Sequence, residues 1–329
     1  MKKFTLLALT MACFNISADL KQALDQDIDD LMEKVIEWRH DIHQYPELGN
    51  REFRTSKKIE DHLRSLGIKV ETKIAYTGLV GILEGDLPGP TIALRADMDA
   101  LPVEEKTGLP FASKVRTTYL GNDVGVMHAC GHDAHTACLL GVVRILDVLK
   151  KEWEGSIKFI FQPAEEQYPG GAQQMIKEGV LESPKVQKMF GQHVFPDLEV
   201  GKVGFCPGKY MASADEIKIT IIGTGGHAAL PDTYNSPITS AARLILCLED
   251  HFLPFRNIPS VFAIGLVQSD GYYNVIPDRV NLKGTFRTIN EKFRLSAHTK
   301  IREITNKIAM EYALDIDLEI RKGYPSLYM

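Results

Sequence analysis

The stretch Ile157–Gln162 (IKFIFQ) anchors the fold, and it runs directly into Pro163-Ala164-Glu165-Glu166. A short apolar run of this kind predicts a buried strand. Two adjacent carboxylates at the end of such a strand are unusual, because charged groups are costly to bury without partners. Taken alone, the pair would more often belong to a solvated loop.

Strands and helices alternate on the N-terminal side of this strand. The helical segments are 31–43, 56–66 and 134–150, and the strand-like segments are 69–72, 78–84 and 91–95. This alternation predicts an α/β domain with a mixed, largely parallel sheet and helices on both faces.

After about Ser213 the order of elements changes. Strands are predicted at 215–223, 260–267, 279–288 and 314–321, and helices at 236–252 and 291–312. The resulting order, βαββαβ, is the ferredoxin-like plan. We therefore expect one domain over residues 19–212 and a second over residues 213–325.

The N-terminus has the pattern of a secretory signal over residues 1–18. Met1-Lys2-Lys3 is followed by a short apolar run that is too short to span a bilayer. The prediction is a secreted or periplasmic protein; the alternative is a buried N-terminal helix in a cytoplasmic protein.

Composition excludes some classes of partner. The chain of 329 residues is 44% hydrophobic and 25% charged, which is ample for two globular domains. The net charge of -5 is mild and no basic stripe is present, which argues against a nucleic-acid partner. No membrane span is expected.

The segment Met127–His135 concentrates metal-binding side chains. It holds Cys130 together with His128, His132 and His135. Thiolate and neutral imidazole are common metal ligands, and Cys130 and His132, two residues apart, could face one site. The alternative is a helix N-terminus that Asp133 caps and whose histidines are solvated.

A third apolar strand, Met189–Val194, carries His193 near its end. Because ligands collect at the carboxyl ends of strands in open α/β sheets, the three segments can converge there. One carboxylate of the Glu165-Glu166 pair could then bind a cation, while the other accepts a proton from metal-bound water.

Four motifs taken together resemble a known family. They are Leu94–Pro102 (LRADMDALP), Cys130–Asp133 (CGHD), Gln162–Glu166 (QPAEE) and Gly225–Ala228 (GGHA). In order and spacing, the chain from about Leu31 to Tyr324 resembles the dinuclear-metal aminoacylase and carboxypeptidase family. The most similar branch contains hippurate hydrolases, N-acyl-amino-acid amidohydrolases and plant auxin-conjugate hydrolases.

The resemblance implies a site for two divalent ions, with zinc or manganese most suitable and nickel or cobalt compatible. The implied metal ligands are Cys130, as the bridging ligand, His132, Glu166 and His193. Glu165 would be the general base, and Asp97 would orient a ligand from behind. Arg95 stands where other branches carry a metal histidine, and His128 and His135 receive no role.

The resemblance also implies that the second domain is an inserted lid through which two copies form a homodimer. His227 would reach the partner's active site and stabilise an oxyanion, while Asn274 and Arg287 would hold the substrate's carboxylate. Taken alone, each of these residues would more often be structural.

The implied reaction is metal-dependent hydrolysis of N-acyl amino acids or small peptide-like amides. In the family, the chain continues beyond the lid, completes the sheet and supplies one more metal histidine, whereas this sequence ends at Met329. The alternative is therefore a catalytically impaired, truncated remnant that acts only as a metal-binding or dimerising fragment.

Overall fold

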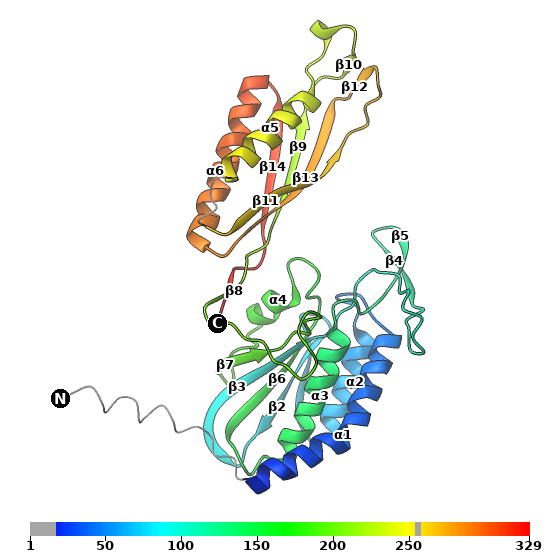
Figure 1. Cartoon of the computed structure of the whole chain (residues 1–329), viewed down its shortest axis with the longest axis vertical. Coiled ribbons are helices and arrows are strands. Elements are labelled where there is room, and N and C mark those ends of the chain that lie inside the picture. The colour runs from blue at the N-terminus through cyan, green and yellow to red at the C-terminus, as the bar shows by residue number, and fades with distance from the viewer. Residues whose placement is uncertain (1–17, 254–257) are drawn as a thin grey trace, which may run out of the picture. The chain divides into compact units, whose positions relative to one another are not determined.

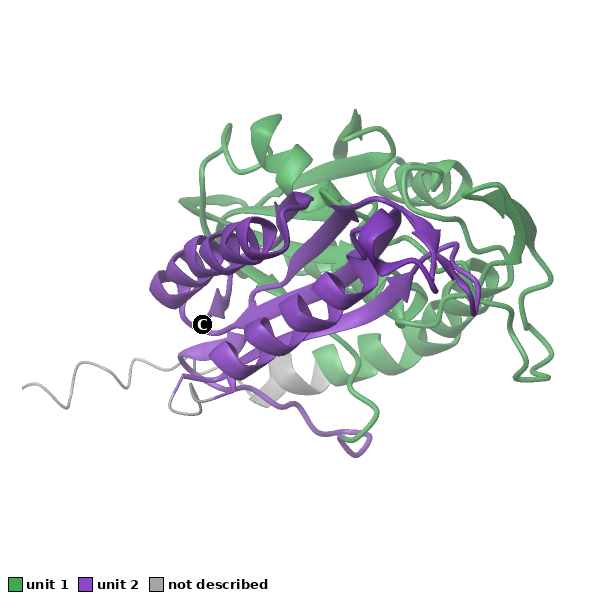
Figure 2. Ribbon diagram, turned by 90° about the horizontal axis from the view of Figure 1, so that it is seen from above, with its two compact units in different colours: residues 1–197 green, residues 198–329 purple. Residues whose placement is uncertain are grey.

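The computed structural model describes residues 18–253 and 258–329 (Figure 1). The chain divides into two compact units, Met1–Asp197 and Leu198–Met329, which Figure 2 colours separately. Apart from Ala18, the predicted signal peptide lies outside the described residues. None of the described helices is both long and apolar enough to cross a membrane.

The first unit is built on a five-stranded mixed sheet in the order β1-β2-β6-β3-β7. The strands are β1 (Lys69–Ile74), β2 (Gly78–Glu84), β3 (Leu87–Asp97), β6 (Glu154–Gln162) and β7 (Val186–Gly191). The strands β6, β3 and β7 are parallel, whereas β1 and β2 add an antiparallel edge. The predicted mixed α/β sheet is confirmed, and β6 is its central strand.

Helices cover both faces of this sheet. On one face lie α1 (Ala18–Gln44), α2 (Phe53–Ser65) and α3 (His132–Val148), packed over Phe159 and Phe161. On the other face, Met175 of α4 (Gly171–Lys177) packs near Ile160. Since side chains alternate along a strand, a strand covered on both faces is apolar throughout, which explains the sequence of β6.

Lys158 is the one charged residue in that apolar run, and it is buried. Its Nζ donates to three backbone carbonyl oxygens, those of Val180 (2.9 Å), Glu182 (2.6 Å) and Pro184 (3.0 Å). The buried ammonium therefore has hydrogen-bond partners, and it holds the turn that leads into β7.

The segment between β3 and α3 carries a small hairpin that the sequence did not predict. It consists of β4 (Arg116–Tyr119) and β5 (Asn122–Gly125). An antiparallel bridge between Leu101 and Met127 closes the base of this excursion. The chain therefore returns to the sheet just before Cys130.

The second unit contains the predicted βαββαβ order. Its elements are β9 (Asp215–Ile222), α5 (Pro237–Phe252), β11 (Ser260–Gln268), β13 (Arg279–Thr288), α6 (Glu291–Tyr312) and β14 (Asp315–Lys322). They form an antiparallel sheet in the order β11-β13-β9-β14, as expected for a ferredoxin-like unit. Its role as a lid and dimerisation surface stays a prediction.

Short elements complete this unit. They are β8 (Lys209–Met211), paired with β15 (Leu327–Tyr328), the ladder of β10 (Gly226–His227) with β12 (Val275–Ile276), and the 3-10 turn η1 (Pro231–Thr233). At the start of β9, Asp215 forms an ion pair with the fully buried Arg294 of α6. Asp215 also accepts a hydrogen bond from the Gly323 amide (3.1 Å), so this pair joins the two ends of the βαββαβ segment.

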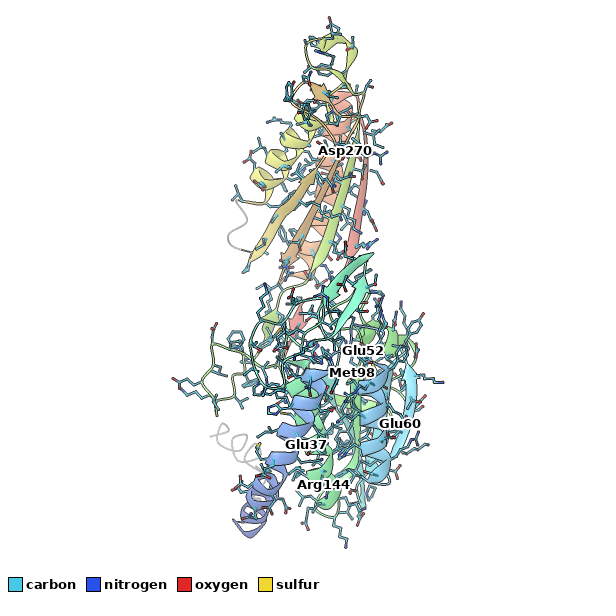
Figure 3. All side chains as sticks on the ribbon, turned by 90° about the vertical axis from the view of Figure 1, so that its right-hand side faces the viewer. Glu37, Glu52, Glu60, Met98, Arg144 and Asp270 are labelled. Carbon is cyan, nitrogen blue, oxygen red and sulfur yellow. The ribbon has the colours of Figure 1, made fainter. Side chains whose placement is uncertain are left out.

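A buried carboxyl group, Glu52, joins three segments of the first unit. This residue precedes α2 and is fully buried (Figure 3). Its carboxyl group accepts hydrogen bonds from the hydroxyl of Thr77 and from the backbone amide of Ala164 (2.8 Å). Ala164 has φ 47°, a costly left-handed conformation for a residue with a side chain. Glu52 thus fixes the turn that carries Glu165.

We predict that the Glu52→Gln variant gains stability relative to the wild type when the pH rises from 4 to 8. Burial raises the pKa of Glu52 to about 7, above its ordinary value of 4.5, despite its two hydrogen bonds. Between these two pKa values the folded state therefore holds a proton that the unfolded state has lost. The free energy of unfolding of the wild type falls by up to about 3 kcal/mol as the pH rises from 4.5 to 7. Glu52→Gln removes that loss.

The measurement is denaturant unfolding of both proteins at pH 4 and pH 8. Tryptophan fluorescence suits it because both tryptophans, Trp38 and Trp153, lie in the first unit. The control is Glu60→Gln, at a carboxylate of α2 that Figure 3 labels. Glu60 is paired with Arg64 and is not fully buried. A stability difference between Glu52→Gln and wild type that does not change with pH would contradict the account.

Candidate metal centre

The carboxyl ends of three parallel strands meet at one edge of the first sheet. There β3 ends at Asp97, β6 ends at Gln162 just before Glu165 and Glu166, and β7 ends at Gly191 just before His193. The helix α3 begins at the same edge, because the Thr136 hydroxyl donates to the Asp97 carbonyl (2.9 Å). The fold therefore brings together the six site residues that the sequence predicted in this unit.

His132 lies at the centre of this group and is almost fully buried. Its Nδ1 donates to the carbonyl oxygen of Asp99 (2.8 Å), so Nε2 is the ring nitrogen left to bind a metal ion once it has lost its proton. That nitrogen lies 3.6 Å from a carboxylate oxygen of Asp97 and 3.9 Å from one of Glu166. His132 is thus held in the ring orientation that a metal ligand needs.

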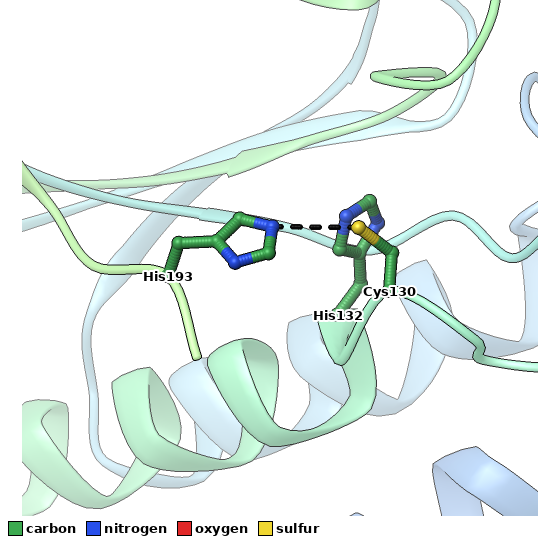
Figure 4. A group of neighbouring side chains, drawn as sticks. All are labelled: Cys130, His132 and His193. Atoms are coloured by element: carbon green, nitrogen blue, oxygen red, sulfur yellow. Dashed lines mark hydrogen bonds between the residues drawn. The ribbon is translucent and has the colours of Figure 1, made fainter. Parts of the chain in front are cut away.

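Cys130 and His193 face each other across the same site, with Sγ and Nε2 3.4 Å apart (Figure 4). His193 Nδ1 donates to the carbonyl oxygen of Val194 (2.7 Å), which turns Nε2 toward Cys130. Gly131, between Cys130 and His132, has φ 84°, and an added Cβ would lie 2.3 Å from Val194. Only glycine allows this turn to approach the His193 segment so closely.

Among the described residues, three groups bring metal-ligating atoms within 4.8 Å of one another. They are Cys130, His132 and His193; His132, Glu165 and Glu166; and Asp97, His132 and His135. His132 belongs to all three groups. Thiol, imidazole and carboxylate together fit a divalent ion of borderline softness.

The charges around His132 also favour a cation. Burial would lower the pKa of His132, but its contact with Asp99 and the charge of Asp97 raise it to about 9. Burial and the neighbouring carboxylate of Glu166 raise the pKa of Cys130 to about 12. The site therefore stabilises a positive charge and disfavours a thiolate that has no counter-ion. A bound metal cation would supply the positive charge and would stabilise the thiolate of Cys130.

The two adjacent glutamates have different surroundings. The backbone amide of Glu166 donates to the Asp99 carboxylate (3.0 Å), which orients that end of the loop. Burial, followed by the charges of Glu166 and Asp97, raises the pKa of Glu165. A carboxyl group with a raised pKa is suited to accept and return a proton near neutral pH.

Asp97 lies beside the free nitrogen of His132, and its carboxylate also accepts from Arg95 (2.7 Å) and from His135 Nδ1 (2.7 Å). These contacts outweigh burial and hold the pKa of Asp97 below its usual range. The residue behind the His132 ring is Asp99, which sequence reasoning missed. Its position two residues after Asp97 was the available signal.

The alternative of solvated histidines capped by Asp133 is wrong, because His128, His132 and His135 are all buried. Asp133 accepts a hydrogen bond from His43 Nδ1 (2.9 Å), and in the part of the chain that the structure describes, α3 has no side-chain cap. Neither ring nitrogen of His128 has a hydrogen-bond partner among the described residues, and burial lowers its pKa to about 4. His128 is therefore a neutral core histidine, and the role of His43 in holding Asp133 was not predicted.

The three site residues predicted in the second unit do not gather at one place. The Ala228 amide donates to the Asn274 carbonyl (3.1 Å), so His227 and Asn274 are neighbours. Arg287 lies near the far end of β13, eight residues beyond Arg279, where this strand begins. At about 3.4 Å per residue, that is about 27 Å.

Similarity to known proteins agrees with this geometry. Residues 93–327 match peptidase family M20/M25/M40. An N-acetyl-L-cysteine deacetylase of Bacillus subtilis is 38% identical over 92% of this chain and 70% of its own length. An N-acyl-L-amino acid amidohydrolase of Geobacillus stearothermophilus is 35% identical over 92% of this chain and 80% of its own length.

Among solved structures, a dinuclear metal-binding M20 peptidase of Bacillus subtilis superposes with a TM-score of 0.75 at 36% identity. The match covers 91% of this chain and 76% of that one. The match over residues 93–327 includes every candidate metal ligand described above. The chain therefore belongs to peptidase family M20/M25/M40 and is a hydrolase that acts on amide bonds.

Proposed function

We propose that this protein is a metal-dependent amidohydrolase that cleaves the amide bond of N-acyl amino acids or small peptide-like substrates. The observation that carries the proposal is the arrangement around His132, whose free Nε2 faces a thiol and several carboxylates beside Glu165. The names of the relatives, an N-acetylcysteine deacetylase and an N-acyl-amino-acid amidohydrolase, support this class of substrate.

The residues that would hold the metal ions are Cys130, His132, Glu166 and His193. The ligand atoms of Cys130, His132 and His193 lie within 4.8 Å of one another, so the Cys130 thiolate would be near enough to both histidines to be shared by two ions. Two divalent ions, zinc or manganese by preference, would polarise the substrate carbonyl and lower the pKa of a water molecule when bound.

Glu165 would move the proton. It takes a proton from the attacking water as the oxygen adds to the acyl carbon, and it returns that proton to the nitrogen as the amide bond breaks. The raised pKa of Glu165 supports both steps, because the group can hold the proton between them. Asp97 and Asp99 keep His132 and Glu166 in place during this cycle.

We infer that the second unit binds the substrate as part of a homodimer. Arg287 can bind a carboxylate through two parallel hydrogen bonds, and His227 and Asn274 offer further donors. Because Arg287 lies about 27 Å from the His227 end of the unit, one copy cannot place all three around one small substrate. A site shared between two copies resolves this separation.

Two further expectations stay proposals. Export to the periplasm or outside the cell rests on the sequence of residues 1–18 alone. The alternative of a non-catalytic metal-binding or dimerising fragment is less favoured, because the family match extends over residues 93–327 and the base lies beside the ligands.

Replacing Glu165 by glutamine should lower kcat by about a thousandfold, since glutamine cannot accept the proton. Metal content should stay unchanged, because Glu165 is not needed as a ligand. The measurement is hydrolysis of a series of N-acyl amino acids together with a metal count by mass spectrometry. Glu152→Gln, at an exposed site, is the control. A Glu165 variant with a tenth or more of wild-type kcat would exclude Glu165 as the base.

Metal binding should release about two protons at pH 7.5. The pKa values of His132, about 9, and Cys130, about 12, both exceed this pH in the metal-free protein, and both groups must lose a proton to ligate. At pH 10 only Cys130 should still release one. Calorimetric titration in buffers of different ionisation enthalpy measures the release, and Cys130→Ala should release one proton fewer. Equal release from both proteins would contradict the role of the thiol.

Mixing two inactive variants tests the shared site. His227→Ala and Arg287→Met should each be inactive alone, because each lacks one substrate contact. After joint unfolding and refolding, about a quarter of wild-type activity should return, since half of the dimers are mixed and each mixed dimer has one intact site. Arg279→Met, at the other end of β13, is the control for Arg287. No recovery in a preparation that contains mixed dimers would place all the residues in one subunit.

A further inference from the structure

His135 has no role in the site described above, yet it is buried beside the site. It lies in the first turn of α3, three residues after His132, and its side chain is 1% exposed. Its ring centroid is 4.6 Å from that of His193, with the two rings steeply inclined to each other. Position alone would allow His135 to act as a metal ligand together with Asp97 and His132.

The hydrogen bonds of His135 argue against ligation. Its Nδ1 lies 2.7 Å from a carboxylate oxygen of Asp97, which can only accept because the salt bridge to Arg95 keeps it ionised. Its Nε2 lies 2.9 Å from the backbone amide of Val194, which can only donate. The proton must therefore be on Nδ1, and the lone pair of Nε2 is already used. No lone pair is left for a metal ion.

Val194 directly follows His193, and both polar groups of its backbone are engaged. The amide donates to His135 Nε2, and the carbonyl accepts from His193 Nδ1 (2.7 Å). The second contact fixes the His193 ring so that its Nε2 faces Cys130. The described segment between β7 and β8 has no helix or strand of its own, so side-chain contacts such as these hold it near the site.

We propose that His135 is a positioning residue. Its ring is bonded to Asp97 and holds the Val194 backbone in place, and this backbone in turn sets the direction of the His193 ligand. The inference deepens the proposed function and rests on it, since His193 is there assigned to one of two divalent ions. It makes His135 a residue that controls how fully the metal site of His193 is occupied, although His135 does not contact the ion.

Two substitutions separate the two contacts of the ring. Asn places its amide nitrogen as far from the backbone as His places Nδ1. His135→Asn therefore keeps the hydrogen bond to Asp97 and loses the hydrogen bond from the Val194 amide. Gln places its amide oxygen as far out as Nε2, so His135→Gln keeps an acceptor for the Val194 amide. In a cobalt(II) titration, we expect His135→Asn to lower the affinity for the second ion tenfold to a hundredfold. We expect His135→Gln to lower that affinity by about threefold or less.

The His193→Ala background distinguishes positioning from ligation. If His135 acts only through His193, His135→Asn should cause no further loss of cobalt affinity once His193 is gone. A further tenfold loss in that background would make His135 itself a ligand and overturn the proposal. Unchanged affinity in His135→Asn would overturn it as well. The cobalt absorption spectrum reports the ligand set independently of hydrolysis.

A metal-free measurement keeps this inference separate from the proposed function. Long-range proton–nitrogen correlation spectra of protein labelled at histidine identify the tautomer of each ring, and His135→Gln assigns the signal. We expect His135 to carry its proton on Nδ1 in the absence of metal; a proton on Nε2 would overturn the proposal. If the wild type binds no cobalt, the proposed function fails, and the tautomer still decides whether His135 holds Val194.

Discussion

The structure depends on one electrostatic constraint, the concentration of negative charge around a buried imidazole. Asp97, Asp99, Glu165 and Glu166 all lie close to His132, and Cys130 adds a thiol that must lose its proton to bind a cation. Such a group is costly to bury unless a positive charge is present. Arg95 compensates part of this charge through Asp97, and a divalent cation at the free nitrogen of His132 would compensate the rest.

The parallel strands of the first unit bring these negatively charged groups together. Because β3, β6 and β7 run in the same direction, their carboxyl ends deliver residues from three distant parts of the chain to one edge. The supporting contacts come from further away still. Glu52 holds the backbone of Ala164, and Lys158 holds the turn ahead of β7, so both segments that flank the site are tied to buried groups.

The sequence predicted most of the regular structure, because periodicity is a local property. The strand β6 and the βαββαβ order could be recognised from the spacing of apolar residues, and the metal-binding side chains from their clustering around Cys130. The contacts of Glu52, His43 and Asp99 could not be predicted, because each joins segments that meet only in the folded chain. The helix α4 was also missed, since seven residues give too short a periodic pattern.

The central claim is that Cys130 is shared by two metal ions. Anomalous diffraction from crystals grown or soaked with zinc or manganese tests it most directly. The account predicts two anomalous peaks, one on each side of the Cys130 sulfur and, for zinc, each about 2.3 Å from it. Density without any anomalous peak around that sulfur, in crystals where the ion is present in the solvent, would contradict it.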